Sequence, residues 1–237
     1  MHPTDPLPRA ALWATLTIAI YAGNRALYRR HRAWWLSPIL AGPALLCLLA
    51  VALRTSYRSY LYGTHWLVAL LGPVTVAFAI PIYEHRRLIR ESWKLLAAGI
   101  VVGCIVSVVS SWLLADLFHL NESIKLSLLP RSMSTPFAMA VSRSIGGAPD
   151  LTAVFTAMTG VLGVAVGEGL LYWLPIRSTF ARGALFGMGA HGAGVAKAQH
   201  LGSEEASSAG LVMVLVGLSN VLIAPWLAKV LHWIRPS

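Results

Sequence analysis

The stretch 129-LPRSMSTPFAMAVSRSIGGAPDLTAVF-155 decides the expected architecture of this chain. It carries arginines, hydroxyl side chains, a proline and a Gly-Gly pair, yet the whole chain is 57% hydrophobic and only 12% charged. Soluble domains carry about twice that charged share, and a chain of 237 residues could not bury this much apolar surface in water. The sequence therefore predicts a membrane protein with a polar, interrupted segment in its second half.

This segment predicts a short helix that begins after a break in the chain. Ser134 or Thr135 is suited to cap the N-terminus of a helix, and Pro136 is suited to its first turn. The pair Gly146-Gly147 is suited to its end. We therefore expect a half-helix of about three turns, which lipid tolerates only where the broken backbone faces protein or water.

The N-terminus of such a half-helix is a candidate anion site. Its unpaired N–H groups and the positive end of its dipole attract a negative charge. Arg131 lies just before the cap and is the expected anion partner, while Thr135 and Ser142 share one helix face because they are seven residues apart. The alternative is that an arginine here, Arg143 above all, only anchors the segment at the membrane interface.

Apolar runs near the ~20 residues that a bilayer requires give the expected fold class. They lie at 9–28, 36–53, 64–83, 95–115, 151–174, 183–200 and 207–231. We expect residues 1–237 to form a single integral membrane domain, all-α and polytopic, with about seven transmembrane helices. The segment 121–149 is expected to dip into the membrane and return, because this places most of the 19 Lys and Arg residues on one side.

The expected spans also suggest an inverted repeat of interrupted helices. Run 64–83 is interrupted by Gly72 and Pro73, with the hydroxyl of Thr75 close to the break. Run 183–200 contains 187-GMGAHGAGVAKA-198, with Gly189, Gly192 and Gly194 among its glycines. Paired interrupted helices in two opposed halves are typical of secondary transporters. The alternative is that Gly and Pro are simply common in membrane helices.

Two ionisable residues inside apolar runs are further candidates. A histidine at the expected depth of His191 is costly without a partner, and it would suit proton coupling. The alternative for His191 is a hydrogen bond to a backbone carbonyl at a helix crossing. Glu168 could pair with His191 or with an arginine, or stay protonated. Its neighbours Gly163 and Gly167 predict close helix packing at that point.

Several classes of function lack support in the sequence. No nucleophile elbow, phosphate loop or metal-ligand spacing is visible, so we expect no enzyme activity, no metal and no cofactor. The net charge of +10 fits basic loops of a membrane protein, and nucleic acid is not an expected partner. Cys47 and Cys104 lie inside apolar runs and are expected to be free thiols.

The central stretch resembles the LrgB/CidB family of bacterial membrane proteins. The resemblance extends over about 55–237 and includes SYRSYLYGTHWLVALLGPVTVAFAIPIYE, ARGALFGMGAHGAGVAKA and VGLSNVLIAPWL. Residues 1–54 match the family only in hydropathy. The family motif often reads GTASHAxGTA, so Met188, Ala190 and Val195 stand where relatives carry hydroxyl residues. His191 and Gly194 are retained, and substrate choice is therefore expected to differ.

The resemblance implies two functions and a location. One is secondary transport of small monocarboxylates of the pyruvate, glycolate or glycerate type, with proton coupling through His191. The other is a holin-like or antiholin-like role in controlling murein hydrolase activity and autolysis, together with an LrgA/CidA-type small membrane protein. The expected setting is the bacterial cytoplasmic (inner) membrane, with lipid, a small carboxylate anion and, as an open alternative, a second copy in a homodimer as partners.

Overall fold

The computed structural model describes residues 6–31, 36, 38–77 and 79–234 of the chain. Within these residues all regular structure is helical. Contacts divide the chain into two compact units, residues 1–74 and 75–237, which are described separately below. The prediction of a single membrane domain over residues 1–237 stays a prediction.

The first unit is a small helical assembly. Helices α1 (Pro6–His31), α2 (Pro38–Ala52) and α3 (Tyr57–Ala69) form it, with α1 packed against both of the others. Trp13 of α1 meets Tyr60 of α3 edge to face, with ring centroids 5.5 Å apart. The hydroxyls of Thr17 and Tyr60 lie 3.3 Å apart, so the polar end of this aromatic contact is also paired.

The described residues of run 64–83 are divided among three helices, but the predicted break at Gly72 and Pro73 stays a prediction. Helix α3 ends at Ala69, and the next helices are α4 (Leu71–Ala77) and α5 (Ala79–Glu84). Gly72 and Pro73 therefore lie in the first turn of α4. The side chain of Thr75 lies outside the described residues, and its predicted role stays a prediction.

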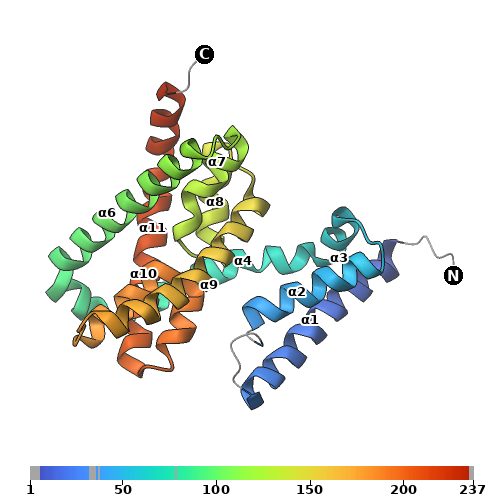
Figure 1. Ribbon diagram of the computed structural model, residues 1–237, viewed down its shortest axis with the longest axis horizontal. Helices are drawn as coiled ribbons and strands as arrows, with labels where there is room; N and C mark the ends of the chain where they lie inside the picture. Colours follow the sequence, from blue (N-terminus) through green and yellow to red (C-terminus); the bar gives the residue numbers. More distant parts are fainter. Residues whose placement is uncertain (1–5, 32–35, 37, 78, 235–237) are drawn as a thin grey trace. The chain divides into compact units, whose positions relative to one another are not determined.

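The second unit contains three helices that are long and apolar enough to cross a membrane. They are α6 (Arg86–Leu117), α9 (Pro149–Trp173) and the Ser203–Lys229 part of α11 (Ser203–Ile234). Between them lie α7 (Glu122–Leu128), the 3-10 helix η2 (Leu129–Ser132), α8 (Thr135–Ile145) and α10 (Thr179–Ala198). Figure 1 shows the long α6 and α11 beside the short α7 and α8. The predicted number of about seven spans stays a prediction.

Residues 122–147 form a broken helical hairpin, which we call hairpin 1. The chain runs through α7 and η2, becomes extended at Met133, and returns through α8. A Cβ placed on Gly147, just after α8, would meet backbone atoms of Leu126 and Ser127 in α7 at 3.1 Å. The two ends of hairpin 1 therefore lie together, and its tip is at residues 132–135. This is the interrupted segment that the sequence predicts over 121–149.

Residues 179–198 form a second hairpin, which we call hairpin 2. His191 interrupts α10 with φ 47° and ψ −124°, far from helical values. Gly194 lies against the backbone of Phe186, eight residues earlier, and against the side chain of Ala190. In a straight helix, eight residues span about 12 Å. The chain therefore doubles back at His191, and the prediction that 183–200 crosses the membrane as one span is wrong.

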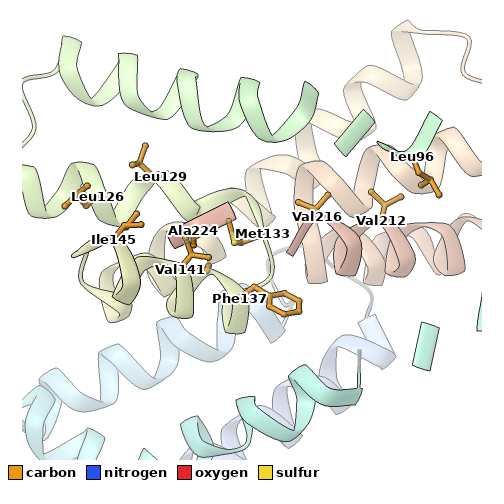
Figure 2. Packing of buried hydrophobic residues seen from close by; sticks show 11 residues of the cluster. Leu96, Leu126, Leu129, Met133, Phe137, Val141, Ile145, Val212, Val216 and Ala224 are labelled. Carbon is orange, nitrogen blue, oxygen red and sulfur yellow. The ribbon is translucent and has the colours of Figure 1, made fainter. Parts of the chain in front are cut away.

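The core of the second unit is built around hairpin 1 (Figure 2). Helix α8 has a strongly amphipathic pattern, and its apolar face is buried against α9 and α11. The buried cluster contains Leu96, Leu126, Leu129, Met133, Phe137, Ala138, Val141, Ile145, Val212, Val216 and Ala224. Because these residues come from both arms of hairpin 1 and from α6 and α11, burial of this surface holds the hairpin tip in place.

Candidate functional site

The tip of hairpin 1 presents an uncapped helix N-terminus, close to what the sequence predicts. Ser134 has the extended backbone of an N-cap residue, and the N–H of Ala138 donates to its carbonyl at 2.9 Å. The Ser134 side chain is only 5% exposed, yet its hydroxyl has no hydrogen-bond partner. Thr135 and Pro136 are the first two residues of α8 and are half-buried. A buried polar atom without a partner is unusual and indicates a place for a ligand or water.

The far end of α8 closes as predicted. Gly146 adopts the left-handed conformation with φ 88°, which glycine adopts without strain. The N–H of Gly147 donates to the carbonyl of Ser142 at 2.8 Å. A side chain on Gly147 would meet both the Ser142 hydroxyl and the α7 backbone. The two glycines therefore end the half-helix and let α7 and α8 approach.

Ser142 belongs to a buried hydroxyl network and does not line either cavity described below. The hydroxyl of Thr152 in α9 lies 2.7 Å from the Ser142 hydroxyl and 2.9 Å from the carbonyl of Ser127, so its single proton is shared between these two acceptors. The Ser127 hydroxyl in turn accepts from the N–H of Ala148 at 2.8 Å. These bonds join α7, α8 and α9 at the base of hairpin 1. The predicted role of Ser142 in binding substrate stays a prediction.

His191 places the tip of hairpin 2 against the tip of hairpin 1. Its side chain is 2% exposed and makes a hydrogen bond to the backbone of Ser132, beside the chain break. The other ring nitrogen, Nε2, is buried without a partner. The imidazole is also close enough to Arg131 for their charges to interact. Two interruptions that are about 60 residues apart in sequence thus meet at one point.

A cavity of about 170 Å³, which we call the tip cavity, lies beside this meeting point. Hairpin 1 contributes Ser132 and Met133 to its wall, and hairpin 2 contributes Gly189. Leu129 of hairpin 1 and Met188 of hairpin 2 also line it. The wall is completed by α6, through Gly103, Cys104, Val106, Ser107 and Val108, and by α11, through Val216 and Asn220. The hydroxyl of Ser107 in this wall is buried and unpartnered; the Ser134 hydroxyl and the Nε2 of His191 are also unpartnered but do not line the cavity. The cavity is mostly apolar with a few polar groups, as small-molecule sites usually are.

Arg131 lines a different cavity, of about 360 Å³, which we call the vestibule. It lies between α6, α7, η2 and α9, and its wall also contains Ser111, Leu114, Ala115, Phe118, Leu120, Leu128, Phe155, Met158, Thr159 and Leu162. The Nε of Arg131 donates to the hydroxyl of Ser111 at 2.9 Å. The guanidinium is half-buried, and this bond uses only one of its nitrogens.

Of the possibilities considered for Glu168, pairing with His191 or an arginine is not what the structure shows. Its carboxylate forms an ion pair with Lys197, and the Glu168 side chain is 50% exposed. This pairing follows from the reversal at His191, because the second arm of hairpin 2 returns alongside α9. The predicted close packing at Gly163 and Gly167 is confirmed: added side chains would meet the Gly189 carbonyl and the Phe186 ring.

The other predicted glycines fall into two groups. Gly189 lines the tip cavity, and its carbonyl lies against α9, while Gly194 lies between the two arms of hairpin 2. A side chain would meet nothing within 4 Å at Gly72 or at Gly192, so close packing does not explain either of these residues.

Sequence reasoning missed the polar residues of α6 and α11 that line the cavities. Ser107 and Ser111 lie one turn apart, and the Ser111 hydroxyl donates to the Ser107 carbonyl at 2.7 Å. The amide nitrogen of Asn220 donates to the sulfur of Cys104 at 3.0 Å, across the tip cavity wall. A cluster of serines in 104-CIVSVVSSWLL-114 and an asparagine in the last apolar run were the available signals.

The apolar helices and the paired hairpins define a helical membrane protein. The chain belongs to the LrgB-like family, whose model matches residues 17–230. The match extends into α1, so the family resemblance begins well before residue 55. No group of three or more side chains that could hold a metal occurs among the described residues.

Three relatives from Bacillus subtilis (strain 168) cover nearly the whole chain. Uncharacterized protein YwbG is 37% identical over 90% of this chain and 94% of its own length. Uncharacterized protein YxaC is 31% identical over 92% of this chain and 94% of its own length. Antiholin-like protein LrgB is 30% identical over 89% of this chain and 91% of its own length. No solved structure matches this chain.

Proposed function

We propose that this chain is a secondary carrier of small monocarboxylates in the bacterial cytoplasmic membrane. The observation that carries the proposal is the hydrogen bond between His191 at the tip of hairpin 2 and the backbone of Ser132 at the tip of hairpin 1, beside the tip cavity. Interrupted helices whose ends meet near the bilayer midplane are the usual substrate site of secondary transporters. A plain pore or scaffold needs no such arrangement.

The order of helices supports alternating access. We take α6, α9 and the apolar part of α11 as spans. Hairpin 1 then begins and ends on the membrane side where α6 ends and α9 begins, and hairpin 2 begins and ends on the opposite side, where α9 ends and α11 begins. Two hairpins that enter from opposite sides give each membrane face a potential opening toward the tip cavity. Movement of one hairpin against the other would then expose the cavity to one side at a time.

The size and chemistry of the tip cavity suit a small carboxylate. An apolar cavity of about 150 Å³ takes benzene, and pyruvate has the same number of non-hydrogen atoms. The N-terminus of α8 begins beside Met133, which lines the cavity, and favours a negative charge through its dipole. The unpartnered Ser134 hydroxyl does not line the cavity in this structure, so carboxylate binding by this group requires a movement of the hairpin 1 tip that turns it toward the carboxylate. His191 does not line the cavity either; after a movement of the hairpin tips its unpartnered Nε2 is the proposed second ligand and, when protonated, the carrier of a coupled proton.

The test is pyruvate uptake into proteoliposomes, with Ser134→Ala and His191→Asn as the informative changes. Removing an unpartnered buried hydroxyl should leave stability almost unchanged. If Ser134 donates to the carboxylate, its loss should raise the KM for pyruvate about tenfold or more, because a hydrogen bond to a charged group is lost. Unchanged KM in Ser134→Ala would remove the α8 N-terminus from the proposed site.

His191→Asn tests proton coupling while keeping a residue that tolerates positive φ. We expect the variant to lose the stimulation of uptake by an inward proton gradient. His200→Asn is the matched control, since His200 is exposed at the end of hairpin 2. If a proton gradient stimulates both variants equally, His191 does not carry the proton.

An antiholin-like role is the second candidate, and the similarity to antiholin-like LrgB favours it. A regulator of murein hydrolases that acts by assembly with an LrgA/CidA-type partner should need no saturable uptake. Reconstituted protein without any uptake of pyruvate, glycolate or glycerate, combined with altered autolysis on expression, would favour this role over the carrier.

A further inference from the structure

We propose that the vestibule beside Arg131 is a second site for small carboxylates, in series with the tip cavity. The Arg131–Ser111 hydrogen bond forms the constriction between them. This inference rests on the proposed carrier function, and it assigns Arg131 to a step before the substrate reaches the hairpin tips.

The two cavities occupy successive positions along α6. Five residues between positions 103 and 108 of α6 line the tip cavity, whereas Ser111, Leu114, Ala115 and Phe118 line the vestibule. At 1.5 Å per residue, their centres are separated by about 13 Å along the helix. The vestibule is therefore nearer the C-terminal end of α6, which is the side from which hairpin 1 enters.

The 3-10 helix η2 separates the cavities, and adjacent residues face opposite ways. Arg131 lines the vestibule, and the next residue, Ser132, lines the tip cavity. The Ser111 hydroxyl accepts from Arg131 and donates to the carbonyl of Ser107, whose own hydroxyl belongs to the tip cavity. Two successive hydrogen bonds thus lead from the guanidinium to the carbonyl of Ser107, a residue that lines the tip cavity.

The chemistry of the vestibule selects an anion. Arg131 is the cation among its lining residues, and Ser111 and Thr159 are the hydroxyl residues. The remaining lining is apolar, so the guanidinium charge is less screened there than in bulk water. The Arg131–Ser111 bond leaves the two terminal nitrogens, which form the fork that binds a carboxylate. A carboxylate of three or four carbons fits the volume of about 360 Å³ with water to spare.

Cys104 in the tip cavity is a natural reporter for passage through the constriction. In a Cys47→Ser background, we would measure labelling of Cys104 by an anionic and a cationic methanethiosulfonate reagent added from the vestibule side. One unit charge near the path predicts that the anionic reagent reacts at least about fivefold faster. Ser111→Ala should accelerate both reagents, because it removes the acceptor that holds Arg131.

Arg131→Gln should abolish the preference for the anionic reagent, and Arg131→Lys should retain it. The matched control is Arg143→Gln, which removes an exposed arginine of α8 that lines neither cavity. A preference that persists in Arg131→Gln overturns the inference. Failure of Cys104 to react even in Ser111→Ala also overturns it, since no path would then join the cavities.

A second reporter distinguishes the two sites. Pyruvate should protect Thr159→Cys in the vestibule from labelling, and this protection should survive His191→Asn but not Arg131→Gln. Protection lost equally in both variants would mean one site, and absence of protection would mean no vestibule site. None of these measurements requires transport. The vestibule inference can therefore fail while saturable pyruvate uptake still supports the carrier, and pyruvate uptake can be absent while the labelling results still support the vestibule site.

Discussion

Hairpin 1 and hairpin 2 bring their tips to the same point by different physical means. The base of hairpin 1 is joined to α9 by directional hydrogen bonds through Ser127, Ser142 and Thr152. Hairpin 2 is held to α9 and α11 by close backbone approach at Gly163, Gly183 and Gly187, supplemented by one ion pair to each helix, Lys197–Glu168 and Arg182–Glu205. Hydrogen bonds fix one geometry, whereas smooth glycine contacts allow small sliding movements. We therefore expect hairpin 2 to be the more mobile of the two.

The largest effect is expected where α9 touches hairpin 2. Gly163→Ala places a methyl group against the backbone carbonyl of Gly189, which cannot move aside as a side chain could. We expect a loss of about 3 kcal/mol in stability, measured by thermal unfolding in detergent. Gly169→Ala on the same helix is the control, because its added methyl meets nothing within 4 Å. Equal melting temperatures for the two variants would contradict glycine-mediated packing of hairpin 2.

A somewhat smaller effect is expected at the base of hairpin 1. Thr152→Val keeps the shape of the side chain but removes the donor to Ser127 and Ser142. Buried acceptors left without partners should lower stability by about 2 kcal/mol. Thr179→Val, at an exposed position, is the control. If Thr152→Val melts like the wild type, hydrogen bonding does not distinguish hairpin 1 from hairpin 2.

The smallest effect is expected at the ion pair between α9 and the second arm of hairpin 2. The Glu168 carboxylate is half-exposed, so Glu168→Gln should cost less than about 1 kcal/mol. A double-mutant cycle with Lys197→Met isolates the coupling between the two side chains. A coupling energy of several kcal/mol would show that a directional contact, and not close packing alone, holds hairpin 2.

The break before α8 could be predicted from sequence because its causes are local. Ser134, Pro136 and Gly146 each favour one backbone conformation, and the structure places a helix start and a helix end where they predict. Close packing at Gly163 and Gly167 was predictable for the same reason, since two glycines four residues apart on one helix face allow a neighbouring helix to approach closely.

The reversal at His191 could not be predicted, because its causes are tertiary. Run 183–200 has the length of a span but is less apolar than the most apolar stretches of α6, α9 and α11, and its glycines fit a close-packed helix as well as a hairpin. The positive φ of His191 is compensated by contacts with Ser132 and with the arms of hairpin 2. The partner of Glu168 was missed for the same reason. Phe186 packs against Gly167, the neighbour of Glu168, and in a straight helix Lys197 would lie about 16 Å beyond Phe186.

The most direct test of the account is the sidedness of the two hairpins. In a background without Cys47 and Cys104, single cysteines replace Ser123, Asp150, Thr179 and Ser203, all exposed at hairpin ends. An impermeant thiol reagent is added to intact cells. The two-hairpin arrangement predicts that the cysteines at positions 123 and 150 are labelled from one side of the membrane and those at positions 179 and 203 from the other. Labelling of 179 and 203 from opposite sides would mean that residues 179–198 cross the membrane, and the meeting of two hairpin tips would be contradicted.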